Sequence, residues 1–176
     1  MSAVEYNVFV GVGSNIDPET NVRDAIFRLE ASARVTAIST VYLTEPVGPA
    51  GQPPFYNCVV ELETDLAPRD LKFQLLRRIE GELGRMRGAD KFTARTIDLD
   101  LILYDELVMT EEDLTLPDPD ILVRPFLAVP LHELSPGLVL PGSGIRISEA
   151  ISAQPRTGMK PLGNYTERMR KEVFHG

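Results

Sequence analysis

The sequence has little cysteine and fewer basic than acidic residues. Its single cysteine, Cys58, excludes an internal disulfide and a zinc site built from four cysteines. Because Cys58 sits in a strand-like run, we expect a small core residue instead of a reactive thiol. The net charge of −8 disfavours a general nucleic-acid binder, since such proteins are usually basic. A locally basic site for a small phosphate compound is still compatible with this charge.

Long apolar runs are missing as well. No segment approaches the roughly 20 apolar residues that cross a membrane. The opening MSAVEYNVFV shows no basic leader followed by an apolar stretch and a cleavage site, which argues against a signal peptide. We therefore predict a cytoplasmic protein that contacts no membrane. Its 176 residues, 43% hydrophobic and 25% charged, are typical of one soluble domain with a sizeable core.

Apolar periodicity predicts four strands and two helices. Strands are indicated by short apolar or alternating runs, and helices by apolar residues three and four apart. The expected segments are a strand at 7–12, a helix at 17–33, strands at 35–47 and 55–64, a helix at 67–86 and a strand at 94–104. This βαββαβ order predicts a ferredoxin-like fold of the α+β class, with an antiparallel sheet and both helices on one face. The other face is left for an extra layer or a ligand.

The remainder of the chain is expected to form a C-terminal extension. Its predicted elements are a short strand at 107–109, one short helix or two helical turns in 124–136, and a short helix at 147–154 capped by Ser148. At the other end, Asp17 is a good cap for the first helix. We expect one domain over 1–154 and a basic, weakly packed tail over 155–176.

Two acids interrupt the apolar run ARTIDLDLILY at 94–104. Side chains two apart in a strand share a face, so Asp98 and Asp100 lie together. The apolar side chains of this strand are predicted to take the opposite face: Ile97, Leu99, Leu101 and Leu103. Two carboxylates about 7 Å apart repel by roughly 2 kcal/mol at an effective dielectric near 20. Either exposure to water or a bound cation offsets this repulsion, and the lack of nearby His or Cys disfavours zinc or copper.

A cationic segment, GRMRGADKFTAR, leads directly into this acidic pair. It carries Arg85, Arg87, Lys91 and Arg95, and its glycines indicate a mobile loop. Such a run is commonly a solvated surface loop. Together with the carboxylates, however, it has the groups that phosphoryl transfer needs, because carboxylates hold a metal and arginines neutralise phosphate charge. The early GVGSN is neither a Walker loop nor a dinucleotide motif. Its Gly11 and Gly13 indicate a tight strand-to-helix turn or, more weakly, a ligand.

The segment TEPVGPAGQPPFYN forms a loop longer than a hairpin needs, and long loops often shape binding sites. It delivers Phe55 and Asn57 to the strand face opposite the expected core stripe. An aromatic ring with a neighbouring amide suits a flat heterocycle that has hydrogen-bonding edges. The alternative is a core phenylalanine and a structural asparagine, and the residues alone do not decide between them.

Several segments, in order along the chain, resemble the 6-hydroxymethyl-7,8-dihydropterin pyrophosphokinases of folate biosynthesis. They are VGSNIDP, YLTEPVGPAGQPPFYNCVVELET, RRIEGELGR, GRMRGAD, KFTARTIDLDLILY and LTLPDPDILVRPFLAVPLHELSP. The likeness covers about residues 6 to 142. Its most specific element is the run R-x-x-D-L-D with a basic residue four positions before the arginine.

The resemblance implies a Mg²⁺-dependent enzyme that moves the pyrophosphoryl group of ATP to the pterin hydroxymethyl group and releases AMP. By this likeness Asp98 and Asp100 hold two Mg²⁺ ions, and Arg85 and Arg95 contact phosphates. The further residues implied at the nucleotide are Arg77, Glu80, Arg87, Lys91, Asp118 and Arg124. The residues implied at the pterin are Thr44, Val47, Phe55, Asn57 and Phe126. ATP and the pterin are then the partners, without nucleic acid or membrane, for a monomer or weak homodimer.

Three positions depart from the family pattern. Asp118 stands where the family often has a histidine that helps bind nucleotide phosphate, which puts ATP affinity at that corner in question. Thr93 replaces a usual Gly or Ala, and Phe92 replaces a frequent Trp, so loop closure is open to change. Two rival functions remain: another metal-dependent nucleotidyl or phosphoryl transferase on the same fold, and a non-catalytic ligand sensor. A sensor would not need the arginines, and another transferase would not need the Phe55, Asn57 and Phe126 arrangement.

Overall fold

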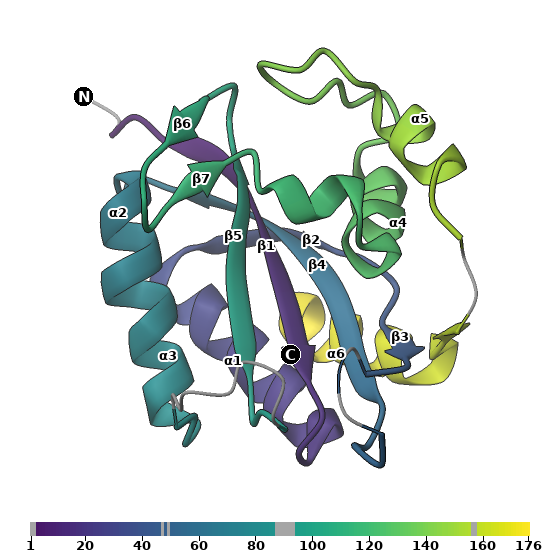
Figure 1. The fold of residues 1–176 in the computed structure, drawn as a ribbon. Coiled ribbons are helices and arrows are strands. Elements are labelled where there is room, and N and C mark those ends of the chain that lie inside the picture. Colours follow the sequence, from purple (N-terminus) through teal and green to yellow (C-terminus); the bar gives the residue numbers. More distant parts are fainter. Residues whose placement is uncertain (1–2, 47, 49, 87–93, 156–157) are drawn as a thin grey trace.

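The protein is a mixed sheet-and-helix structure. A computed structural model describes residues 3–46, 48, 50–86, 94–155 and 158–176. Six strands form the main antiparallel sheet: β1 (Tyr6–Ser14), β2 (Arg34–Ile38), β3 (Tyr42–Thr44), β4 (Phe55–Thr64), β5 (Asp98–Tyr104) and β8 (Met159–Pro161) (Figure 1). The strand order is β5-β1-β4-β3-β8, and β2 also pairs with β4. The predicted α+β class and antiparallel sheet are therefore confirmed.

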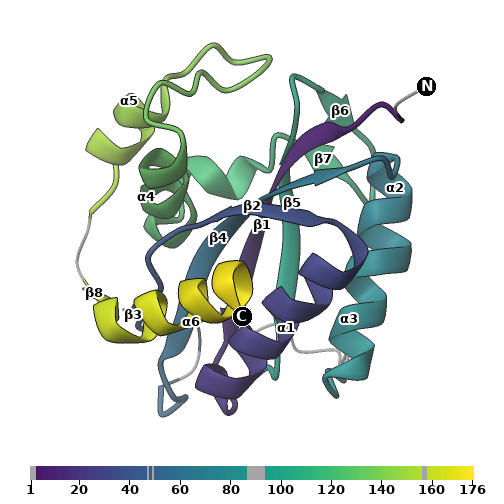
Figure 2. The ribbon, with the colours of Figure 1, turned by 180° about the vertical axis from the view of Figure 1, so that it is seen from behind.

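Helices cover both faces of the sheet. They are α1 (Pro18–Ser32), α2 (Pro68–Asp70), the π-helical segment η1 (Leu71–Leu76), α3 (Arg77–Glu82), the 3₁₀ segment η2 (Pro119–Leu122), α4 (Pro125–Leu134), α5 (Ile147–Ser152) and α6 (Gly163–His175). The helices α1 and α6 lie on the face seen in Figure 2, and α2, η1 and α3 follow one another along the chain beside them. The helices α4 and α5 form the layer on the opposite face. No helix among the described residues has the length and apolar character needed to cross a membrane.

The alternation of β4 divides its side chains between two apolar cores. Cys58, Val60 and Leu62 join the core beneath α1 and α3, whereas Val59 joins the core beneath α4. Both cores are packed because each strand face meets a helical layer. Burial raises the pKa of the Cys58 thiol to about 12, so this thiol stays protonated, as expected of a core residue.

The predicted strand at 35–47 is two strands. β2 pairs with residues 60–63 of β4 and β3 with residues 55–57, so both strands lie beside β4. Between them, Ser39 makes two hydrogen bonds to β4. Its N–H donates to the Val59 carbonyl, and its hydroxyl oxygen accepts from the Val59 N–H, each at 2.9 Å. The β-branched composition predicted extended backbone correctly but carried no signal for this interruption.

A bulge in β5 corrects one predicted side-chain direction. Phe9 pairs with Leu103 and Val10 with Leu101, so Ile102 is the extra residue. Leu103 therefore turns to the α4 core together with Ile102, while Leu101 stays in the α1 core. The expected alternation is right up to Leu101 and wrong for Leu103, because a bulge reverses the facing of the residues beyond it.

Two predicted helix caps are also wrong. Asp17 stands at the N-cap position of α1, but its backbone φ is 40° and its side chain makes no capping hydrogen bond. Its carbonyl accepts instead from the N–H groups of Thr20 and Asn21. Ser148 lies inside α5, which begins at Ile147.

The expectation of a weakly packed tail over 155–176 is wrong. β8 pairs with β3, and α6 packs beside α1 with Tyr165, Thr166 and Met169 buried. The Tyr165 hydroxyl donates to the Glu19 carbonyl at 2.6 Å and so joins α6 to α1. Of the basic residues of this segment, Arg168 and Lys171 are exposed on α6, whereas Arg170 is half-buried and donates to the Ile38 carbonyl.

Replacing Met169 by alanine tests this packing. We expect Met169→Ala to lower the free energy of unfolding by about 2–4 kcal/mol, because a side chain only 1% exposed would leave a cavity. Urea unfolding followed by circular dichroism measures the change. Val4→Ala, at a residue 68% exposed, is the control and should change that free energy by less than about 0.5 kcal/mol. Equally small effects in both variants would contradict the packing of α6 into the core.

Candidate active site

A cleft of about 430 Å³ brings most of the predicted site residues together. Its lining comes from β1, β3, β4, β5, η1, α3, α4 and the segments beside them. The predicted residues that line it are Thr44, Phe55, Asn57, Arg77, Arg85, Arg95, Asp98, Asp100, Arg124 and Phe126. Segments far apart in the sequence thus converge on one cavity, as the sequence predicted.

Two arginines hold the first of the paired acids. Arg85 Nη1 lies 2.6 Å from one carboxylate oxygen of Asp98, and Arg95 Nη1 lies 2.7 Å from the other. Burial works against the charged form of Arg85, but the neighbouring acids outweigh it and raise the pKa of its guanidinium. Arg85 is therefore a fixed positive charge, and its position is set by the carboxylate that it binds.

Among the described residues, none donates a hydrogen bond to the carboxylate of Asp100, which is exposed to the cleft. The surrounding protein encloses its carboxyl on the other sides. This enclosure, with the negative charges of Asp98 and Asp118, raises the pKa of Asp100 well above its usual value. The predicted repulsion between the two acids is thus present in the folded protein, and Arg85 relieves only part of it.

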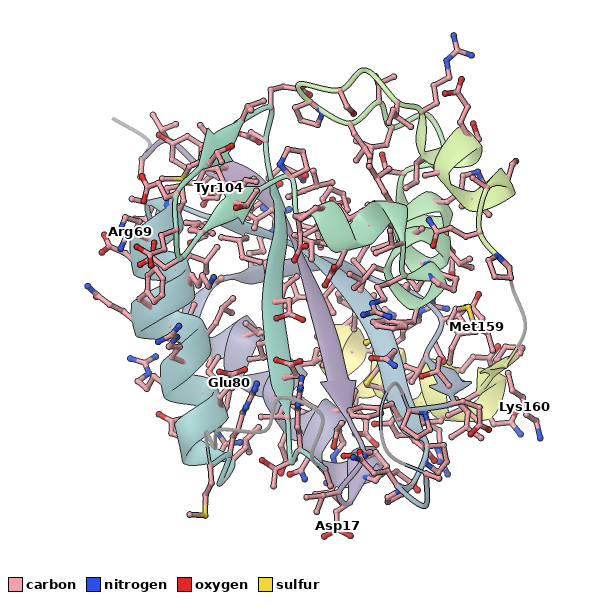
Figure 3. The ribbon with its side chains drawn as sticks, in the orientation of Figure 1. Asp17, Arg69, Glu80, Tyr104, Met159 and Lys160 are labelled. Atoms are coloured by element: carbon pink, nitrogen blue, oxygen red, sulfur yellow. The ribbon has the colours of Figure 1, made fainter. Side chains whose placement is uncertain are left out.

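Glu80 supports the site from behind. Its Oε2 accepts from Arg85 Nη1 at 2.7 Å and from the backbone N–H of Leu99 at 2.9 Å. The side chain lies between α3 and β5 and is only 2% exposed (Figure 3). Glu80 does not line the cleft, because this carboxylate is buried behind Arg85 and joins the helix to the strand, and its expected place at the nucleotide stays a prediction.

Two glycines of β1 form the floor of the cleft. Gly11 pairs with Asp100 and Gly13 with Asp98 across the sheet. A Cβ at Gly11 would come within 2.9 Å of Leu127 Cδ2, and one at Gly13 within 2.6 Å of Asn57 Oδ1. These glycines lie within a strand and not in a tight turn, and their missing side chains leave room for the neighbouring cleft residues.

An amide and two aromatic rings shape the other end of the cleft. Asn57 is 9% exposed, and its Nδ2 donates to Thr44 Oγ1 at 2.7 Å. This bond joins β4 to β3 and fixes which way the amide points. Phe55 and Phe126 are half-buried and reach the cleft from β4 and α4. A planar ligand between them would meet two apolar rings and a fixed polar edge.

Asp118 lies beside the cleft and not in its lining. Its carboxylate accepts from the backbone N–H of Asp120 at 2.9 Å and so caps η2. Burial raises the pKa of Asp118, against the effect of this hydrogen bond. The sequence placed Asp118 at the nucleotide, whereas the structure gives it a capping role and brings Asp120 to the cleft instead. Val47, Arg87, Lys91, Phe92 and Thr93 lie outside the described residues.

Sequence reasoning missed two residues of this site. Asn15 is 3% exposed, and its Oδ1 accepts from the N–H of Arg95 at 2.7 Å while its Nδ2 donates to the Pro53 carbonyl at 3.2 Å. Asn15 thus ties the end of β1 to both adjoining loops, and its place in VGSN was the available signal. Lys72 lines the cleft with Arg77 because the π-helical segment brings residues five apart onto one side. No sequence pattern showed that segment.

The oxygen ligands of Asp98 and Asp100 suit a hard cation such as Mg²⁺. Their mutual repulsion, visible in the raised pKa of Asp100, is what a bound divalent cation would offset. Within the described part of the chain, no three acidic, histidine or cysteine side chains converge on one point. A cation here would therefore need further oxygen ligands from water or from a bound phosphate.

The chain matches a family model over residues 9–136, described as 7,8-dihydro-6-hydroxymethylpterin-pyrophosphokinase. A 2-amino-4-hydroxy-6-hydroxymethyldihydropteridine pyrophosphokinase of Pseudomonas aeruginosa is 37% identical over 158 residues, with 88% of this chain and 96% of the relative covered. The enzyme of the same name from Bacillus subtilis is 40% identical over 129 residues, covering 72% of this chain and 76% of its own. The family match covers β4, β5, all but the first three residues of β1 and the whole lining of the cleft.

The fold is similar to that of a larger solved protein. A Plasmodium falciparum HPPK-DHPS structure with pterin and p-hydroxybenzoate superposes with a TM-score of 0.66 at 12% sequence identity. The superposition covers 98% of this chain and 44% of that one, so this chain spans less than half of its length. At this identity the likeness concerns the fold alone.

Glu80 offers a test of the support behind the site. We expect Glu80→Ala to lower the free energy of unfolding by about 2–4 kcal/mol, because it leaves the buried N–H of Leu99 without its acceptor and removes one of the two carboxylates that pair with Arg85. Chemical denaturation measures this change. Glu82→Ala, on the same helix in an ion pair with Arg28 and 46% exposed, is the matched control and should cost less than about 1 kcal/mol. A Glu80→Ala variant as stable as Glu82→Ala would contradict the role of Glu80 in joining α3 to β5.

Proposed function

The chain belongs to the 7,8-dihydro-6-hydroxymethylpterin-pyrophosphokinase family, and we propose that it transfers pyrophosphate from ATP to 6-hydroxymethyl-7,8-dihydropterin, giving AMP and the pterin diphosphate for folate biosynthesis. One observation supports this function above the others. A single cleft joins an acid-arginine cluster to an amide flanked by two aromatic rings. A ligand sensor does not explain the first group, and a transferase for another acceptor does not explain the second.

The pterin is assigned to the end formed by β3, β4 and α4. Phe55 and Phe126 would stack on the two faces of its ring, and Asn57 would hydrogen-bond its polar edge. The Asn57 amide is held by Thr44 before any ligand arrives, so little ordering remains to oppose binding. Val47 stays part of this prediction, although it lies outside the described residues.

The triphosphate is assigned to the end formed by α3 and β5. Arg85 and Arg95 offer guanidinium donors beside Asp98, and the same cleft is also lined by Arg77, Arg124 and Lys72. Asp98 and Asp100 would hold Mg²⁺, with two ions expected. When bound, Mg²⁺ would neutralise phosphate charge and make the acceptor hydroxyl easier to deprotonate. The arginines orient the phosphates for in-line attack and stabilise the charge that moves to the AMP leaving group.

Some finer features belong to the same proposal. We infer a ferredoxin-like sheet, which the order β5-β1-β4 followed by β2 and β3 supports. Consumption of ATP favours a cytoplasmic location. Arg87 and Lys91 are proposed to close over the phosphates and exclude water, which would otherwise compete with the pterin hydroxyl as acceptor.

An assay for AMP tests the reaction directly. Wild-type protein with ATP, Mg²⁺ and 6-hydroxymethyl-7,8-dihydropterin should release AMP, and Asp98→Asn or Asp100→Asn should lower kcat by about a hundredfold or more. Circular dichroism checks that each variant is folded. Glu106→Gln, an exposed carboxylate just after the same strand, should leave kcat within about twofold. No AMP from wild type, or full turnover by either aspartate variant, would refute the proposal.

Two glycine substitutions separate pterin binding from general stability. Gly13→Ala places a methyl group within 2.6 Å of Asn57 Oδ1, so we expect the pterin KM to rise about tenfold while the ATP KM changes little. Gly81→Ala adds the same methyl group in α3 with nothing within 4 Å, and it should leave both KM values unchanged. Steady-state kinetics with each substrate varied in turn give these constants. An equal rise of both KM values in Gly13→Ala would place the pterin elsewhere.

A further inference from the structure

In the connection at 39–41, between β2 and β3, Ser39 is held by β4, whereas the backbone of Thr40 and Val41 is held by parts of the chain outside the main sheet. The Thr40 N–H donates to Glu133 Oε1 at 2.9 Å. The Val41 N–H donates to Thr166 Oγ1 at 2.9 Å, and the Val41 carbonyl accepts from the Leu162 N–H at 2.8 Å. Since backbone groups that leave a sheet need other partners, the shape of this connection depends on α4 and α6.

Arg170 of α6 joins these parts into one network. Its Nε and Nη2 donate to the Ile38 carbonyl at 2.9 and 2.7 Å, where β2 ends. Its Nη2 also lies 3.3 Å from Glu133 Oε1, which accepts from the Thr40 hydroxyl as well. One guanidinium thus connects α6, the end of β2 and α4. Thr166 lies four residues earlier on α6 and is 1% exposed.

Both elements held by this network carry cleft residues. β3 begins at Tyr42, directly after the connection, and ends at Thr44, which orients the Asn57 amide. α4 carries Phe126 seven residues before Glu133, a spacing that puts both on one side of a helix. The distance between β3 and α4 sets the space into which a flat ring must fit.

We infer that α6 is a positioning element for the pterin end of the cleft, with Thr166 and Arg170 as its positioning residues. The inference rests on the proposed function and deepens it, because it assigns pterin affinity to a helix outside the family match at 9–136. The nucleotide end is built by α3 and β5, which none of these hydrogen bonds touches. Loss of the network should therefore weaken pterin binding and spare nucleotide binding.

Ligand binding to Arg170→Ala and Thr166→Val tests this inference. The pterin Kd is measured by calorimetry with saturating Mg²⁺ and α,β-methylene-ATP, which occupies the nucleotide end without transfer. We expect each variant to raise this Kd about tenfold, while the Kd of the ATP analogue stays within about twofold. Thr166→Ser keeps the hydroxyl and should restore wild-type affinity. Arg168→Ala, on the same helix in an exposed pair with Glu19, is the matched control and should change neither constant.

The outcomes separate this inference from the function on which it rests. A wild-type protein that binds no pterin refutes the proposed function. In that case amide hydrogen exchange of residues 40–44 still tests the positioning, since it should quicken in Arg170→Ala and Thr166→Val but not in Arg168→Ala. Wild-type pterin affinity in both variants, below their melting temperatures, would overturn the inference. Equal weakening of pterin and nucleotide binding would overturn it as well, because that result means general loosening of the fold.

Discussion

The contact of Arg85 with Glu80 and Asp98 is the interaction on which the site depends. One guanidinium nitrogen lies within 2.7 Å of both carboxylates, so a single positive charge sits between two negative ones. Glu80 also binds the N–H of Leu99, which lies between the two cleft aspartates along β5. The strand that carries the acids is thereby locked to the helix that precedes the cationic loop. An ion pair this enclosed is costly to break and gives the cleft a fixed geometry.

The cleft exists because β1 lacks side chains where it passes the acids. The sheet is packed on both faces. On the face toward α1 and α3, residues such as Val10 and Val12 fill the space. Gly11 and Gly13 point the other way, toward the α4 side, and a methyl group at either would collide with Leu127 or Asn57. The site is therefore open because Gly11 and Gly13 have no side chains. Two missing side chains give no apolar periodicity by which the sequence could predict the cleft.

Features that depend on one segment alone could be predicted from the sequence. Features that depend on how one segment packs against another segment of the chain could not. The strand at 55–64 was bounded correctly because its alternation is a property of the segment itself. Leu103 faced the wrong way because the bulge arises from pairing with β1. The role of Glu80 was missed because it needs β5 beside α3. The tail is a different case. Tyr165, Met169 and Val173 recur every four residues, a spacing typical of a buried helical face, but the abundance of basic residues favoured the prediction of a weakly packed tail.

The charges of the cleft fit its proposed ligand better than the charge of the whole protein does. A net charge of −8 would repel a free polyanion. The lining, however, holds five basic side chains, namely Lys72, Arg77, Arg85, Arg95 and Arg124, against four acidic ones, Glu45, Asp98, Asp100 and Asp120. A nearly balanced site attracts a free triphosphate only weakly. Under the proposed function it would favour a triphosphate already complexed with a divalent cation, because the acids would then meet the cation and the arginines the phosphates.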